Sequence, residues 1–179
     1  MNTARLQRDK RRRWKSIRAD LKIVFGVVIM HNISEIEFAA SYAKAAHFGQ
    51  IDKSGEDYIL HPIAVADSLN GVADYLKVAA LLHDVVKDTD TALEDLKELD
   101  FDPRAIAIVK LLTRIEQESY DQFIKRISDS ENYDAILVKT ADIRHNLSRR
   151  FKGDESLHHR YKKALDILNK KYTAGPQIT

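Results

Sequence analysis

The chain has 179 residues, contains no cysteine and carries a formal net charge of +2 at pH 7. A single domain is the default at this length, and the lack of cysteine excludes a disulfide scaffold and a cysteine-based zinc site. The hydrophobic share of 44% is enough for a core, but no apolar run reaches the roughly 20 residues needed to span a bilayer. We therefore expect a cytoplasmic protein that has no contact with the membrane.

The first 33 residues differ from the rest in charge. Residues 1–20 hold eight Arg or Lys against two Asp, so the remaining chain is net acidic. The apolar run at 23–30 is interpreted as buried rather than as an anchor. A basic arm can contact nucleic acid, yet Trp14 is its one aromatic residue for stacking on bases. We expect the basic arm at 1–20 to be a solvated extension, residues 1–33 have no assigned role, and nucleic-acid binding stays open.

From Ser34 onward, apolar residues recur at helical spacing. Ser34 and Glu37 form a capping-box pattern, which predicts a helix that ends near 47–49. A polar loop follows at 50–57, and Pro62 suits the first turn of the next helix. Further helices are predicted to begin at 72–74, after a cap at Thr89 or Asp90, and at 102–103, and to span 120–127, 133–147 and 157–172. Strand-like alternation is absent, so the sequence predicts an all-α bundle of six to eight helices, with a domain over 34–172 and a tail at 173–179.

The most informative feature is the pair His83-Asp84, which follows the apolar segment 79–82 within a predicted helix. Burying ionisable groups is costly unless they are paired or bind a metal. His61 opens an earlier predicted helix and Asp142 lies in a later one. Helical domains build internal metal sites from inward-facing side chains of this kind, and two imidazoles with two carboxylates suit a divalent transition metal such as Mn²⁺ or Fe²⁺. Taken singly, each residue is more simply explained as a structural histidine or a capping aspartate.

Four segments resemble the HD-domain hydrolases of the RelA/SpoT type, including the small stand-alone alarmone hydrolases. They are Ala46–Gln50, Lys53–Ala66, Ala80–Thr89 and Val138–Leu147, and the resemblance covers about residues 36–170. The resemblance implies that Mn²⁺ is bound by His61, His83, Asp84 and Asp142. It also implies a nucleotide substrate, with removal of the 3′-pyrophosphate of ppGpp or pppGpp to give GDP or GTP.

The same resemblance implies contacts with the nucleotide. Lys53 and Asn146 match nucleotide-contacting positions, and Tyr58 falls where the pocket wall is expected. Tyr161 matches a tyrosine that contacts the base or the ribose. Arg144 lies near Asp142 in the sequence and is a candidate to stabilise a phosphate, although its helical position is equally compatible with facing solvent.

The chain departs from the family pattern at Lys87. The family has Glu-Asp where this chain has Lys87-Asp88, and those acids help to position the attacking water. We interpret Asp88 as the remaining proton-handling group, and Lys87 as a cation that disfavours proton abstraction yet can grip a phosphate. Three outcomes stay open: weaker alarmone hydrolysis, hydrolysis of another nucleotide such as an NMP or a dNTP, and nucleotide binding without turnover. The sequence leaves the oligomeric state open.

Overall fold

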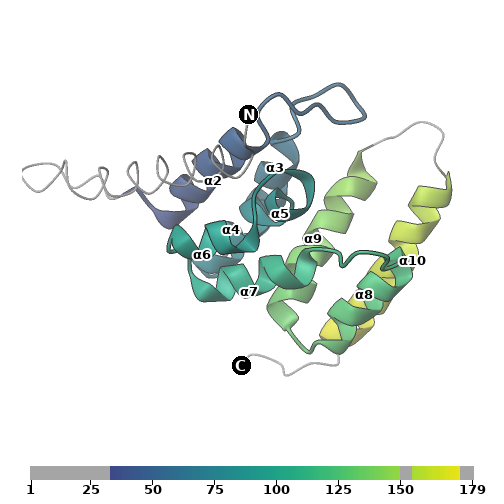
Figure 1. Cartoon of the computed structure of the whole chain (residues 1–179). Coiled ribbons are helices and arrows are strands. Elements are labelled where there is room, and N and C mark those ends of the chain that lie inside the picture. The colour runs from purple at the N-terminus through teal and green to yellow at the C-terminus, as the bar shows by residue number, and fades with distance from the viewer. Residues whose placement is uncertain (1–32, 150–154, 174–179) are drawn as a thin grey trace, which may run out of the picture.

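The computed structural model describes residues 33–149 and 155–173, which form helices joined by loops (Figure 1). The helices are α2 (Glu35–Ala46), α3 (Leu60–Ser68), α4 (Asp74–Leu82), α5 (Val85–Asp88), α6 (Leu93–Glu98), α7 (Pro103–Leu112), α8 (Tyr120–Asp129), α9 (Tyr133–Ser148) and α10 (Glu155–Thr173). The described residues contain no sheet, and one isolated bridge joins Ile51 to Asp57 in the loop after α2. The prediction of an all-α fold is confirmed. The basic arm and apolar run within 1–32, and residues 174–179 of the predicted tail, lie outside the described residues.

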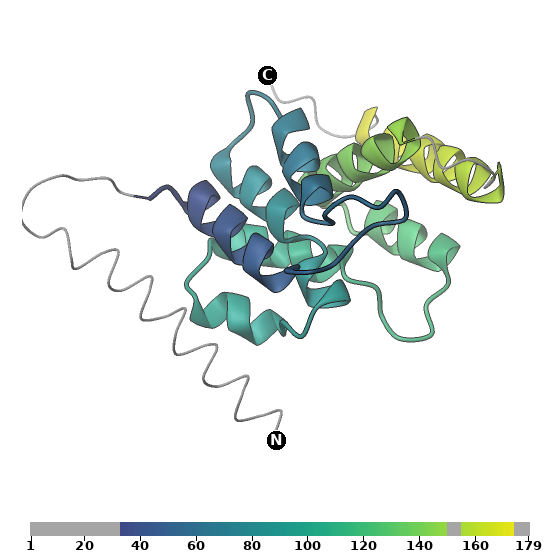
Figure 2. The same cartoon turned by 90° about the horizontal axis from the view of Figure 1, so that it is seen from above.

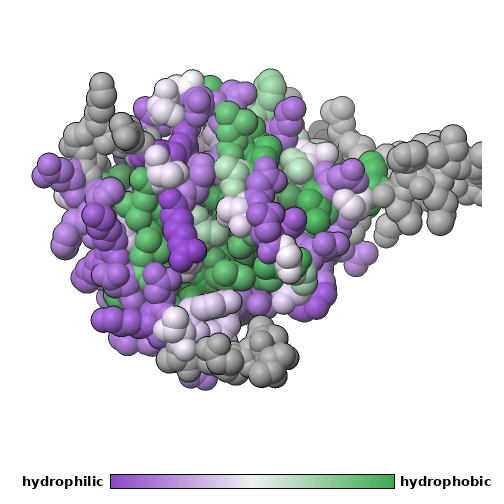
Figure 3. All heavy atoms as spheres, turned by 180° about the vertical axis from the view of Figure 1, so that it is seen from behind, coloured by the Kyte–Doolittle hydropathy of each residue, from purple (hydrophilic) through white to green (hydrophobic). Residues whose placement is uncertain are grey.

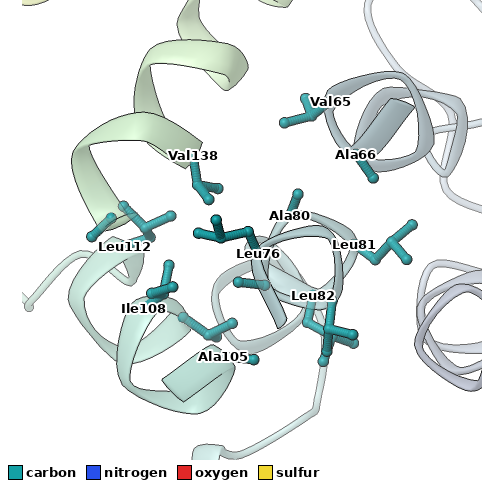
Figure 4. Packing of buried hydrophobic residues seen from close by; sticks show 14 of the residues in the cluster. Val65, Ala66, Leu76, Ala80, Leu81, Leu82, Ala105, Ile108, Leu112 and Val138 are labelled. Atoms are coloured by element: carbon teal, nitrogen blue, oxygen red, sulfur yellow. The ribbon is translucent and has the colours of Figure 1, made fainter. Parts of the chain in front are cut away.

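Helix α4 lies at the centre of the fold. Its side chains at 76 and 78–82 are all buried, as expected for a helix that is apolar over most of its surface. It packs against α2, α3, α7 and α9. Figure 4 shows Leu76 of α4 beside Ile108 of α7 and Val138 of α9, with Val65 of α3 on the side of Ala80. The apolar segment of the sequence therefore forms the core on which the other helices are assembled.

Helix α9 connects two groups of helices. It packs against α3, α4 and α7 on the one hand and against α8 and α10 on the other, and α8 and α10 lie side by side in both Figures 1 and 2. Seen from behind, hydrophobic side chains are exposed in the middle of the molecule with hydrophilic ones around them (Figure 3). No helix in the described part of the chain is long and apolar enough to cross a membrane.

Two helix starts follow the signals read from the sequence. The amide of Glu37 donates to the Ser34 hydroxyl at 3.2 Å, and the Ser34 amide donates to the Glu37 carboxylate at 2.8 Å. These two bonds are the predicted capping box. Asp102 caps α7 by accepting a hydrogen bond from the Arg104 amide at 2.8 Å, with Pro103 as the first helical residue.

The predicted cap of α6 at Thr89 or Asp90 is wrong. The residue before α6 is Ala92, whose amide donates to the Asp95 carboxylate at 2.8 Å. The Thr89 hydroxyl instead donates to the Val85 carbonyl at 2.6 Å. The Asp95 carboxylate in the first turn therefore accepts from the amide of the N-cap residue, and the alanine at that position offers no side-chain acceptor to the amides of the first turn.

Phe101 anchors the first group of helices, since it is 2% exposed and its ring lies 5.2 Å from that of Phe38 and 6.0 Å from that of Tyr42. We expect Phe101→Ala to lower the free energy of unfolding by about 3–5 kcal/mol, because truncating a buried phenylalanine leaves a cavity. Urea unfolding followed by circular dichroism measures this change. Phe48→Ala is the control, because Phe48 is 88% exposed and its loss should cost less than about 0.5 kcal/mol. Equal effects of the two substitutions would contradict the packing described here.

Candidate metal centre

The sequence placed the pair His83-Asp84 within a helix, but in the structure the pair lies in a break between two helices. Helix α4 ends at Leu82 and α5 begins at Val85. Successive residues of a continuous α-helix project about 100° apart, so neighbouring side chains diverge there. In the break, His83 Nε2 and Asp84 Oδ2 lie 3.1 Å apart. The two adjacent side chains therefore face the same point, and the backbone of both residues stays in the right-handed helical region.

His61 and Asp142 complete the set from two other helices. His61 lies in the first turn of α3 and Asp142 in the middle of α9. The distance from His61 Nε2 to Asp142 Oδ1 is 3.1 Å, and the same nitrogen lies 3.8 Å from Asp84 Oδ2. Ligand atoms of His61, His83 and Asp142 all lie within 4.8 Å of one another, and the three residues are buried. The structure thus brings together the four residues that the sequence predicted as ligands.

The hydrogen bonding of His83 fits a metal ligand. Its Nδ1 lies 2.6 Å from the carbonyl oxygen of Ala80, a group that can only accept, so Nδ1 carries a proton. Its Nε2 is buried without a hydrogen-bond partner among the described residues, and it faces Asp84 and, at 3.8 Å, Asp142. Two imidazole nitrogens and two carboxylates are a donor set for a divalent transition metal. The residues present therefore fit such an ion.

Opposite charges shift the pKa values of this cluster. Burial would raise the pKa of Asp84, but the adjacent His83 outweighs burial and holds that pKa well below its usual range. Burial likewise opposes ionisation of Asp142, and the charge of Lys139 reverses the effect and lowers the pKa. Burial would lower the pKa of His83, yet the charge of Asp84 raises it to about 9. Both carboxylates therefore stay ionised at neutral pH, which is the form that binds a metal ion.

Three further side chains fix the two carboxylates. Lys139 Nζ donates to Asp142 Oδ2 at 2.6 Å, and Asn146 Nδ2 donates to Asp142 Oδ1 at 2.6 Å. The Tyr58 hydroxyl donates to Asp84 Oδ2 at 2.6 Å, and burial together with Asp84 raises the pKa of Tyr58, so the hydroxyl keeps its proton. Partners of this kind orient metal ligands in proteins.

Lys87 and Asp88 form an ion pair beside the cluster. Lys87 Nζ lies 2.8 Å from each Asp88 carboxylate oxygen and 3.9 Å from Asp84 Oδ1. The Tyr58 hydroxyl lies 3.2 Å from Asp88 Oδ2. The Lys87 side chain is 43% exposed. The residue that departs from the family pattern therefore neutralises the neighbouring acid.

The cluster lines a cavity of about 650 Å³. Four of the five residues predicted to bind substrate also line it: Lys53, Tyr58, Asn146 and Tyr161. Arg144 does not, since its side chain is exposed and lines a second cavity of about 340 Å³ together with His145. The main cavity also holds cations that were not assigned from the sequence: Arg114, Lys139, Arg149 and Arg160.

Arg149 attaches the loop that carries Lys53 to the end of α9. Its guanidinium donates to the carboxylate of Asp52 and, at 2.8 Å, to the Ser54 hydroxyl. Asp52 also accepts hydrogen bonds from the Ser54 amide at 2.7 Å and the Glu56 amide at 3.1 Å. Burial would raise the pKa of Asp52, but the bonds from Ser54 and Arg149 outweigh it and hold the pKa well below its usual range. The position of Lys53 in the cavity wall thus depends on the contact between Asp52 and Arg149, which are 97 positions apart in the sequence.

We expect Asp52→Asn to destabilise the protein at neutral pH, because it removes the charge that Arg149 binds. A carboxyl whose pKa is lowered by folding stabilises the native state above its unfolded pKa of about 3.9, and this contribution disappears as the pH falls through the folded pKa. The difference in urea midpoint between wild type and Asp52→Asn should therefore be constant from pH 7 to about pH 5 and narrow below about pH 4. Asp57→Asn, at an exposed position of the same loop, is the control. A difference that grew on acidification would contradict the ion pair.

The comparisons with known proteins agree with this geometry. The model of a family described as "HD domain" matches residues 39–155. This is more than half of the chain, and the chain therefore belongs to the HD domain family.

Curated relatives share this part of the chain. A guanosine-3′,5′-bis(diphosphate) 3′-pyrophosphohydrolase of Aquifex aeolicus is 36% identical over 129 residues, which are 71% of this chain and 18% of that protein. The bifunctional (p)ppGpp synthase/hydrolase SpoT of Escherichia coli is 34% identical over 128 residues, 64% of this chain and 18% of the relative. The chain thus spans about a fifth of the length of these relatives.

A solved structure supports the fold. A metazoan protein, described as an ortholog of SpoT that hydrolyzes ppGpp, matches with a TM-score of 0.67 and 22% identity. The match covers 82% of this chain and 89% of that one. The two proteins therefore share the same arrangement of helices.

Proposed function

We propose that this chain is a metal-dependent phosphohydrolase that removes pyrophosphate from the 3′ position of guanosine alarmones. The observation that carries the proposal is the His61, His83, Asp84 and Asp142 cluster in the wall of a 650 Å³ cavity that is also lined by cations. A cavity of this size accommodates a nucleotide-sized ligand. The relatives that hydrolyse guanosine alarmones suggest the substrate: ppGpp would give GDP, and pppGpp would give GTP. We place the protein in the cytoplasm, where such nucleotides occur.

The proposed metal is Mn²⁺, with Fe²⁺ as the alternative, because the donor set is mixed nitrogen and oxygen. When bound, such a cation polarises a phosphoryl oxygen and lowers the pKa of water. The chain itself supplies the geometry. Lys139 and Asn146 hold the two oxygens of Asp142, and Tyr58 holds Asp84, so the ligands need little rearrangement when an ion enters.

In the proposed reaction, water attacks the phosphorus of the 3′-diphosphate in line with the leaving 3′-oxygen. Pyrophosphate departs and the 3′-hydroxyl regains a proton. Asp88 is the proposed group that orients the water and accepts its proton, and Tyr58 donates to it at 3.2 Å. Lys53 and Tyr161 are the proposed contacts with the nucleotide, since both line the cavity.

The Lys87–Asp88 ion pair favours a second candidate function. An acid whose two oxygens are both bound by an ammonium group is not free to bind water, which supports nucleotide binding with little turnover. We give the first candidate precedence because phosphate can compete with Asp88 for Lys87. Lys87 would then bind a substrate phosphate, and Asp88 would be released to orient the attacking water.

The first test is hydrolysis of ppGpp by purified protein with Mn²⁺, beside GTP, dNTPs and nucleoside monophosphates. We expect GDP and pyrophosphate from ppGpp and a rate at least about 100-fold lower for Asp84→Asn, because losing even an outer partner of a metal ligand typically costs 10- to 100-fold and here a ligand itself is changed. Circular dichroism should show an unchanged helical fold. Normal activity of Asp84→Asn would contradict the assignment of Asp84 as a metal ligand. Hydrolysis of another nucleotide but not of ppGpp would contradict the alarmone as the substrate.

A second test separates the two roles of Lys87. If Lys87 holds a substrate phosphate, Lys87→Gln should raise KM about 10-fold, the equivalent of one charge-assisted hydrogen bond of roughly 1.4 kcal/mol, with kcat changed less than about twofold. Lys110→Gln, at an exposed position on α7, is the control. An increase in kcat at constant KM would show instead that Lys87 only restrains Asp88.

A further inference from the structure

His145 contacts the candidate ligand His61 on the side that faces away from the carboxylates. The two Nδ1 atoms lie 2.7 Å apart, and the ring centroids are 4.9 Å apart with an interplanar angle of 36°. His145 stands three positions after Asp142 on α9, so the two side chains share one face of the helix. His61 is buried, whereas His145 is half-buried and borders the second cavity.

A contact between two ring nitrogens constrains both rings. One nitrogen must carry the proton and the other must offer a lone pair. His61 Nε2 faces Asp142 Oδ1 at 3.1 Å and Asp84 Oδ2 at 3.8 Å. For Nε2 to offer its lone pair to a cation at that point, the proton of His61 must sit on Nδ1. His145 is then the acceptor, and its own proton sits on Nε2.

The second imidazole of the cluster is held differently. His83 Nδ1 bonds to the backbone carbonyl of Ala80 at 2.6 Å, and a carbonyl can only accept. The Nδ1 of His61, in contrast, faces a side chain, that of His145. The orientation of one imidazole is therefore fixed by the main chain, and that of the other depends on the identity of one residue.

We infer that His145 is a positioning residue that holds His61 in the ligand-ready tautomer by accepting a hydrogen bond from its Nδ1. The inference rests on the metal site of the proposed function but not on the substrate. Outer partners of metal-binding histidines typically change metal affinity 10- to 100-fold when they are lost. We expect a loss of that size when the acceptor at position 145 is removed.

The matched variants are His145→Asn and His145→Leu. The two replacements have nearly the same shape, but asparagine keeps an acceptor at the δ position and leucine has none. His158→Leu is the control, because His158 is an exposed histidine on α10. Mn²⁺ affinity is measured by calorimetry on the full chain, and the absorption bands of bound Co²⁺ report the geometry of the ligands.

We expect His145→Leu to bind Mn²⁺ about 10- to 100-fold more weakly and to alter the Co²⁺ spectrum. His145→Asn should recover most of the affinity, and His158→Leu should match the wild type. Equal affinity of the asparagine and leucine variants would overturn the inference, because the acceptor would then have no effect. If circular dichroism shows that His145→Leu is unfolded, His145→Ala takes its place in the same comparison.

The experiment also separates this inference from the proposed function. The metal titrations contain no nucleotide. If the wild-type protein binds Mn²⁺ but leaves ppGpp intact, the proposed substrate is contradicted, and the titrations of the His145 variants still decide the role of His145. A wild-type protein that binds neither Mn²⁺ nor Co²⁺ would overturn the inference together with the metal site.

Discussion

Two ionised carboxylates lie among aliphatic side chains, and the compensation of their charge organises the rest of the site. Asp142 is buried and the Asp84 side chain is 14% exposed, next to a core built by α4. An uncompensated charge in such a place is costly. Imidazoles, an ammonium group and a tyrosine hydroxyl surround the two acids. This arrangement makes the cluster suitable for a divalent cation and also specifies which polar groups the core must contain.

Two lysines beside the cluster, Lys139 and Lys87, differ in exposure and therefore in what their ion pairs can do. Lys139 is buried, and its ammonium group is held against Asp142, so it contributes to the position of the ligand. Lys87 is half exposed and pairs with Asp88, so its bond can be exchanged for a bond to a ligand in the cavity. The same type of side chain thus has opposite consequences at two depths, because solvent weakens the exposed pair and not the buried one.

The sequence was sufficient for the fold class, which has local signals, and it led to four candidate ligands through the His83-Asp84 pair and the resemblance of the flanking segments. Capping residues and helical periodicity mark the helices, and His83-Asp84 stands out at the end of an apolar run. The break between α4 and α5 was missed because it contains neither glycine nor proline. The cap of α6 was assigned to the wrong residues, because the helix begins after Ala92, which has no capping side chain.

The contacts made by Arg149 and His145 had no local signal at all. Arg149 meets Asp52, and His145 meets His61, only because α9 packs beside α3 and beside the loop before it. Side chains on a helix surface look alike in sequence whether they face solvent or a distant loop. Arg144 illustrates the same point, since its neighbours on α9 line the main cavity while it does not.

The arrangement of α8 and α10 has a consequence for how such proteins diversify. The four candidate ligands come from α3, α9 and the break after α4, whereas Tyr120 and Tyr161 of the cavity wall come from α8 and α10, which pack mainly on each other and on α9. The wall that faces the ligand can therefore accumulate substitutions without disturbing the ion-binding centre or the core around α4. One ion-binding framework can in this way be inherited unchanged while the wall of the cavity changes.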